Sequence, residues 1–268
     1  MINIDPGPIR RRGNKPHGAP YLDGTWWTQP SSLAKALDDG EGLIGWTARM
    51  TVLGMARSAD LIALASTLKP EQYADLNNVV DQALTRAKHQ ASATLGTAIH
   101  SATQAHDEGQ DTDHLPQDLR DAVGRYQSLL DDHQLTPVAA EVFVVNRALG
   151  CAGTLDRIYA GPNRVVVGDI KTSKSTAPRY SAVAWAIQVA TYAGSEPVVD
   201  GQIVTWEDAG LPRPSQDHAV IVHLPNDKPE SPQILVADLK QGRALAELAK
   251  AVREHRKWTP VSTLAQAQ

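Results

Sequence analysis

Two patterns of apolar and polar positions divide the chain near residue 135. Before it, apolar residues recur every three or four positions, as on one face of an α-helix, over 42–68, 70–89, 94–108 and 116–133. After it, valine- and isoleucine-rich runs typical of β-strands cover 138–145, 153–171, 202–206, 219–224 and 234–237. The patterns predict an α/β protein with a helical part over about 29–133 and a sheet-rich part over about 138–258.

The clearest strand pattern is GTLDRIYAGPNRVVVGDIKTSK, residues 153–174. Two strand-like segments flank the turn-favouring sequence AGPN, which predicts a hairpin. Because side chains alternate across a strand, Asp169 and Lys171 share one face and Ile170 points to the other. A hairpin of this length can bring Asp156 beside Asp169. Two carboxylates and one ammonium would then meet at the edge of an apolar sheet, an arrangement that suits a divalent cation beside a phosphate.

An Asp-x-Lys motif alone indicates little, because on most strands it is a solvated face or a surface ion pair. Residues on both sides strengthen it. Gly96 and His100 are one helical turn apart, so the glycine allows close packing and the histidine can reach a metal. Glu141 opens the strand before the hairpin, and Gln188 and Tyr192 are again one turn apart. Each has a plainer explanation by itself, such as a buried structural histidine or a core aromatic.

The composition of the chain limits the kinds of functional site that it can form. The chain has 268 residues, 42% of them hydrophobic, and a net charge of −4, so any nucleic-acid surface must be local. Cys151 is the only cysteine, which excludes an internal disulfide and a zinc or iron–sulfur site built on several cysteines. No phosphate-binding G-x-x-x-x-G-K-[ST] loop occurs, so no ATP-driven motor is expected. No signal-peptide pattern and no apolar stretch of membrane-spanning length is found, and a cytoplasmic location is expected.

Charge is unevenly distributed along the chain. Residues 1–24 are rich in proline and glycine and carry a basic cluster over 10–15, which predicts a loosely ordered arm, either a solubilising tail or a phosphate contact. Acidic residues concentrate over 106–132, a face expected to point away from DNA. The last predicted helix, 239–257, is basic and is either a solvated face or the flank of a DNA groove. No linker separates the two halves, so 25–268 is predicted to be a single domain.

In chain order the motifs are G-x-x-x-H, E, G-x-x-D, D-x-K and Q-x-x-x-Y, from Gly96 to Tyr192. This order resembles the RecB-type nucleases of the PD-(D/E)XK superfamily, and residues 31–49 resemble the helical entry of phage-encoded members. The resemblance implies a restriction-endonuclease-like core, a mixed sheet flanked by helices. Leu155 stands where the superfamily name has proline, which RecB-type members tolerate. The iron–sulfur cysteines of some relatives are missing, so no such cluster is expected.

The resemblance also implies a site. Four groups would bind one or two Mg²⁺ or Mn²⁺ ions: His100, Asp156, Asp169 and the backbone carbonyl of Ile170. Lys171 would orient or deprotonate the attacking water and stabilise charge on the phosphate, while Glu141 would support the metal or Lys171. Asp156, Asp169, Lys171 and Glu141 form the implied catalytic set. Four residues would hold the substrate strand or brace the site: Gln188, Tyr192, Lys174 and Arg179.

The expected function is that of a metal-dependent DNA exonuclease in phage-type recombination, repair or processing. Its expected partners are DNA and a single-strand annealing or recombination protein, with no membrane, in the cytoplasm of the host if the chain is phage-encoded. One alternative is a structure-specific or restriction-like endonuclease. Another is a non-catalytic DNA-binding module with the nuclease fold, which the intact set His100, Asp156, Asp169 and Lys171 argues against.

Overall fold

The computed structural model describes residues 1–11, 18–38, 40–87 and 89–257. The chain forms two compact units, one made of Met1–Asp38 with the chain from His100 onward, the other of Asp39–Ile99. The first unit contains the sheet and the predicted site residues from His100 to Tyr192. In the second, the described residues form helices and the turns that join them. That 25–268 acts as one domain stays a prediction.

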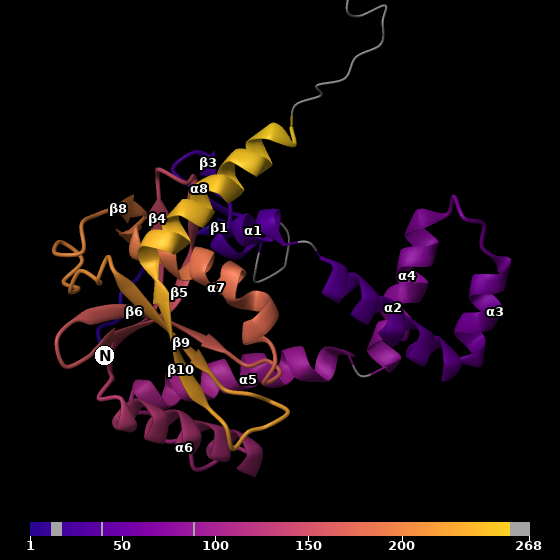
Figure 1. The fold of residues 1–268 in the computed structure, drawn as a ribbon, viewed down its shortest axis with the longest axis horizontal. Helices are drawn as coiled ribbons and strands as arrows, with labels where there is room; N and C mark the ends of the chain where they lie inside the picture. The colour runs from indigo at the N-terminus through magenta and orange to yellow at the C-terminus, as the bar shows by residue number, and fades with distance from the viewer. Residues whose placement is uncertain (12–17, 39, 88, 258–268) are drawn as a thin grey trace, which may run out of the picture. The chain divides into compact units, whose positions relative to one another are not determined.

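A seven-stranded mixed sheet is the centre of the first unit (Figure 1). Its order is β10-β9-β6-β5-β4-β7-β8. The strands are β4 (Thr136–Asn146), β5 (Cys151–Ala160), β6 (Val165–Lys171), β7 (Glu196–Val199), β8 (Gln202–Ile203), β9 (His218–His223) and β10 (Gln233–Asp238). β6 pairs with β9 in parallel, and the other neighbours are antiparallel. The predicted α/β class with a mixed sheet is confirmed, although β7 was not predicted and β8 is shorter than expected.

Helices cover both faces of this sheet. On one face, α7 (Pro178–Ala193) and α8 (Leu239–His255) join a large apolar cluster with Leu155 and Ile158 of β5. On the other face, α6 (Gln117–Asp132) meets the sheet where Tyr126 contacts Tyr159, which follows Ile158 and therefore points the opposite way. Figure 1 shows α6 on the far side of the strands from α8. The part of α5 (His89–Asp107) from His100 onward lies on the α6 side of the sheet, where Asp107 contacts Tyr126.

The predicted hairpin is confirmed. β5 and β6 pair antiparallel with Arg157 opposite Gly168, and Gly161 N donates to Arg164 O at 2.8 Å to close the turn. The tight approach of the two strands depends on Gly168. A Cβ atom there would lie 2.1 Å from Tyr159 Cε2, so only glycine leaves room for this buried ring. The glycine directly before Asp169 therefore has a packing role.

The N-terminal residues differ from the loose arm that the sequence predicted. Ile2 N donates to Val138 O at 2.8 Å, and Gly201 N donates to Pro6 O at 2.9 Å, so the described start of the chain is bound to the sheet region. Three short strands form a small antiparallel sheet: β1 (Arg10–Arg11), β2 (Pro20–Leu22) and β3 (Thr25–Trp26). Unpaired backbone groups in irregular segments bond to nearby strands whatever their side chains, which composition cannot reveal. The side chains of the basic cluster over 10–15 lie outside the described residues.

The second unit contains α2 (Glu41–Ala56), α3 (Ala59–Thr67) and α4 (Tyr73–Arg86). Leu61, Val79 and Ala83 form its core. The single long helix expected over 42–68 is wrong, because it breaks before Ala59. Ser58 Oγ donates to Gly54 O at 2.8 Å, and this bond competes with helix continuation, as serine hydroxyls commonly do.

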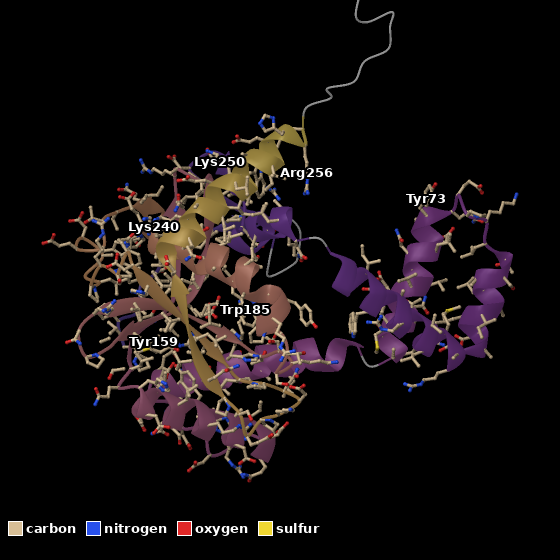
Figure 2. All side chains as sticks on the ribbon, in the orientation of Figure 1. Tyr73, Tyr159, Trp185, Lys240, Lys250 and Arg256 are labelled. Atoms are coloured by element: carbon tan, nitrogen blue, oxygen red, sulfur yellow. The ribbon has the colours of Figure 1, made fainter. Side chains whose placement is uncertain are left out.

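The basic residues of α8 hold the fold together. Three of them, and Arg256 directly after the helix, donate to backbone carbonyls: Arg243 to Gln216, Lys250 to Ala148, Arg253 to Ser32 and Arg256 to Ala36. The last two fasten α1 (Pro30–Ala34) and the short 3-10 helix η1 (Lys35–Leu37) to α8. Figure 2 labels Lys240, Lys250 and Arg256 along this helix. These contacts favour a structural role for α8 over the flank of a DNA groove. Among the described residues, no helix has the length and apolar character needed to cross a bilayer.

Replacing Gly168 by alanine is predicted to destabilise the protein by about 1–3 kcal/mol or more, because the new methyl group overpacks the Tyr159 ring. The measurement is urea unfolding followed by circular dichroism. Gly124 is the matched control, since it lies exposed within α6 and an added Cβ meets nothing within 4 Å. Gly124→Ala should gain up to about 1 kcal/mol from helix propensity. Equal stability of Gly168→Ala and wild type would contradict the packing argument.

Candidate active site

Asp156 and Asp169 lie on neighbouring strands of the hairpin. Arg157 pairs with Gly168, and one step along the same register places Asp156 opposite Asp169. Asp156 Oδ2 accepts a hydrogen bond from Ile170 N at 2.8 Å, so the first carboxylate is fastened to the strand that carries the second. The residue-level prediction that a hairpin brings these two carboxylates together agrees with this geometry.

Asp169 is buried and poorly satisfied. It is 1% exposed, and neither carboxylate oxygen has a hydrogen-bond partner among the described residues. Lys171 Nζ lies 2.7 Å from Asp169 Oδ2, a close ion pair without hydrogen-bond alignment. Lys171 Nζ donates instead to Gln188 Oε1 of α7 at 3.1 Å. A buried carboxylate that lacks hydrogen bonds and faces a single ammonium is costly, which is typical of a position that a ligand completes.

Burial sets the protonation of this pair. It raises the pKa of Asp169 to about 7, with Lys171 opposing the rise and Asp156 adding to it. For Lys171, burial works against the charge, but Asp169 and Asp156 outweigh it and its pKa is raised. Lys171 is therefore an ammonium at neutral pH. This state suits orienting groups and stabilising negative charge, and it does not suit taking a proton from water.

His100 reaches the site from α5. Its Nδ1 lies 3.7 Å from Asp156 Oδ2, and the ring also bonds the backbone of Ile170. Burial lowers the pKa of His100 despite the opposing charge of Asp156. The imidazole is therefore neutral at pH 7, the form that binds metals. Three of the predicted ligands thus converge: His100, Asp156 and Ile170.

Glu141 differs from its predicted place. It lies within β4 and not at its start, with a positive φ of 51°. Its Oε1 lies 3.8 Å from Arg157 Nη1, and its side chain is 43% exposed. Ala139 and Val142 belong to the same apolar cluster although three residues apart, so the alternation breaks here. A non-glycine residue in the left-handed region is uncommon, and sequence alone gives no signal for it.

The two residues expected on α7 brace the site. Gln188 accepts from Lys171, as described above. Tyr192 is 5% exposed, and burial followed by the charges of Asp156 and Asp169 raises the pKa of its phenol. A Cβ at Gly153 would lie 3.1 Å from Pro30 Cδ, so this glycine leaves room for α1, while the Tyr192 hydroxyl would lie at an ordinary contact distance of 3.5 Å. The buried ring supports packing over stacking on a substrate.

Lys174 and Arg179 lie apart from this buried group. Both are exposed in the segment between β6 and the first turn of α7. The loop is held in place by Asp227, which accepts from Ser175 N at 2.7 Å. Their charges are therefore presented to solvent from a fixed loop directly after Lys171.

Sequence reasoning missed a buried polar cluster behind the site. Arg157 is fully buried, and its Nε donates to Asp107 Oδ2 at 2.7 Å. Tyr126 donates to the same oxygen at 2.8 Å and lies 3.0 Å from the hydroxyl of Tyr159, labelled in Figure 2. Asp107 had been grouped with the acidic face over 106–132, which is wrong for this residue. A signal existed in the chain, since His100 and Asp107 are seven residues apart on one helix face.

The groups around Asp156 and Asp169 suit a divalent cation by their chemistry but are not yet arranged around one point. Within the described ranges, no three His, Cys, Asp or Glu side chains are arranged closely enough to hold an ion, since Asp169 faces Lys171 while His100 pairs with Asp156. The chemistry nevertheless fits: carboxylate, carbonyl and imidazole groups are ligands for Mg²⁺ or Mn²⁺. The unsatisfied oxygens of Asp169 are what a cation would complete.

The raised pKa of Asp169 predicts that Mn²⁺ affinity depends on pH. Below about pH 7 Asp169 carries a proton that each bound ion must expel, so affinity should rise by up to about tenfold per pH unit and level off above pH 7. Burial lowers the pKa of His100, so its deprotonation lies at lower pH than that of Asp169. Calorimetry at pH 6 and pH 8, in buffers of different ionisation enthalpy, measures both affinity and proton release.

Asp169→Asn is the control, since it should bind Mn²⁺ weakly and without the pH dependence. Equal wild-type affinity at pH 6 and pH 8, with no proton released at pH 6, would contradict the assignment of the raised pKa to Asp169.

Comparison with known proteins agrees with this geometry. A family model described as the PD-(D/E)XK nuclease superfamily matches residues 71–258, which include His100, Asp156, Asp169 and Lys171. No curated protein sequence matches the chain. Members of this superfamily generally use divalent metal ions such as Mg²⁺, in keeping with the carboxylates found here. With more than half of its length matched and its two carboxylates and lysine on one hairpin, the chain belongs to the PD-(D/E)XK nuclease superfamily.

Proposed function

We propose that this chain is a metal-dependent DNA exonuclease of the RecB type, a stand-alone enzyme similar to phage-encoded members. The observation that carries the proposal is Asp169, a buried carboxylate without hydrogen bonds, opposite Asp156 and 2.7 Å from the ammonium of Lys171. The motif order from Gly96 to Tyr192 supports the subtype. A recombination, repair or processing role, with a single-strand annealing or recombination protein as partner in the cytoplasm, belongs to the same proposal.

Each residue has a role in this proposal. Asp156, Asp169, His100 and the Ile170 carbonyl would hold Mg²⁺ or Mn²⁺, which supplies positive charge at the phosphate and lowers the pKa of a bound water. Lys171, an ammonium at neutral pH, orients the water and stabilises charge on the phosphate. Gln188 fixes the position of its Nζ atom. Glu141 supports the site through Arg157.

The charge distribution supports attack from an end. The net charge is −4, and three basic residues of α8, together with Arg256 directly after it, are engaged with backbone carbonyls. Lys174 and Arg179 are exposed in the segment that follows Lys171 and would contact phosphates of the substrate strand. A small basic region without a sequence-reading element favours threading a strand from its end over gripping a long duplex.

The experiment compares end-labelled linear DNA, single- and double-stranded, with covalently closed circles of the same sequence, in Mg²⁺ and in Mn²⁺. We expect linear DNA to be degraded and circles to persist, because a strand must enter by its end. Raising the salt concentration should slow degradation strongly.

Lys171→Ala is the control for contaminating nucleases. It should abolish cleavage while leaving DNA binding, since Lys174 and Arg179 would still contact the phosphates. Cleavage of closed circles at the rate of linear DNA would replace the exonuclease by the endonuclease alternative. Binding without cleavage of any substrate would favour the non-catalytic module.

A further inference from the structure

One face of α5 forms a polar seam with β5. His100, Thr103 and Asp107 are spaced three and four residues apart, so they share a helix face. His100 Nδ1 lies 3.7 Å from Asp156 Oδ2, and Asp107 Oδ2 accepts from Arg157 Nε at 2.7 Å. Between them, Thr103 Oγ1 accepts from Arg157 Nη2 at 3.5 Å. The helix therefore meets two adjacent residues of the strand through its polar side chains.

Arg157 is the centre of this seam. Besides Asp107 and Thr103, its Nη1 donates to the backbone carbonyl of Asp156 at 2.7 Å. The same nitrogen lies 3.8 Å from Glu141 Oε1. One fully buried guanidinium thus contacts α5, β4 and the backbone of a predicted metal ligand. A planar group with five donors in fixed directions can hold partners on several sides at once, whereas a lysine offers three donors on a single nitrogen.

Arg157 and Asp107 each favour the charged form of the other against the effect of burial. Burial opposes the charge of Arg157, but its neighbours, Asp107 among them, outweigh it and its pKa is raised. Burial raises the pKa of Asp107, while the Arg157 guanidinium opposes that rise. A buried ion pair contributes little net stability compared with apolar packing, so its value lies in fixing one arrangement.

The arrangement that it fixes is the register of α5. Moving a helix by one residue shifts it 1.5 Å and turns it by about 100°. Such a slip would take His100 away from Asp156. Apolar residues on the seam would tolerate it, whereas the Asp107 carboxylate meets Arg157 Nε in one register. Thr103 Oγ1 also donates to His100 O at 3.0 Å, which ties the turn carrying His100 to the seam.

We propose that Arg157, held by Asp107, is a positioning residue that fixes the Asp156 backbone and the register of α5, so that His100 and Asp156 face one point. The inference rests on the proposed function, in which His100 and Asp156 bind the same metal ion. Its test is made so that the two can fail separately.

The test compares Arg157→Lys and Asp107→Asn with Tyr159→Phe in the full chain. Arg157→Lys keeps the charge but cannot hold Asp107 and the Asp156 carbonyl together. Asp107→Asn keeps the shape and loses the charge. Tyr159→Phe is the matched control, since it removes a buried hydroxyl from the same cluster without touching a bond of Arg157. Circular dichroism establishes which variants are folded.

The first readout is the amide signal of Ile170 and the ring signals of His100 in metal-free NMR spectra. Ile170 N donates to the Asp156 carboxylate, so its proton reports the position of that side chain. Both signals should move in Arg157→Lys and Asp107→Asn and stay in Tyr159→Phe. The second readout is Mn²⁺ affinity by calorimetry, expected to fall about 10–100-fold in the two seam variants only.

Wild-type NMR signals and wild-type Mn²⁺ affinity in either folded seam variant would overturn the inference. Equal losses in Tyr159→Phe would also overturn it, because they would reflect general packing. If one seam variant does not fold, the other decides by the same criteria. If wild type binds no Mn²⁺, the proposed function fails, and the NMR comparison alone still decides whether Arg157 positions Asp156 and His100.

Discussion

A carboxylate buried without hydrogen bonds is expensive, and Asp169 imposes this cost on the whole structure. The surroundings keep it in place by other means. Its strand, β6, lies between β5 and β9 and is bonded on both sides. Lys171 supplies the neighbouring charge, and Gln188 of α7 holds that ammonium. The stability of the sheet is used to keep a chemically demanding group where folding alone would not place it.

Two glycines and a buried arginine keep the neighbours of the hairpin in place. Gly168 lets the Tyr159 ring lie against β6, and Gly153 leaves room for Pro30 of α1 beside β5. Both glycines let a bulky side chain lie close to the hairpin without displacing its strands. Arg157 then joins the back of the hairpin to α5 through Asp107. The groups that would meet substrate are few, and a larger number of residues keep them in position.

The hairpin could be predicted because its signals are local. Valine-rich segments, a turn sequence and side-chain alternation are sufficient to place Asp169 beside Lys171 and to bring Asp156 near. The ordered motifs from Gly96 to Tyr192 added the family, since each is weak and the order is specific.

The features that could not be predicted from the sequence depend on contacts between segments that are far apart in the chain. Asp107 looked like one of many acids over 106–132, because nothing in the sequence shows that Arg157 is buried 50 positions away. The positive φ of Glu141 and the pairing of Ile2 with β4 likewise have no local signal in the sequence. The basic residues of α8 looked suited to DNA until their carbonyl partners were known. Local sequence patterns therefore predicted the chemical groups of the site. The residues that hold those groups in position could be identified only from the tertiary structure.

The central claim is that Asp156 and Asp169 together hold a divalent cation. Diffraction from crystals soaked in Mn²⁺, recorded at an energy where manganese scatters anomalously, tests it most directly. The account predicts an anomalous peak within about 2.0–2.6 Å of carboxylate oxygens from both residues, with His100 facing it. A peak elsewhere, or no peak while Asp169 stays against Lys171 and Asp156 stays on Ile170 N, would contradict the account.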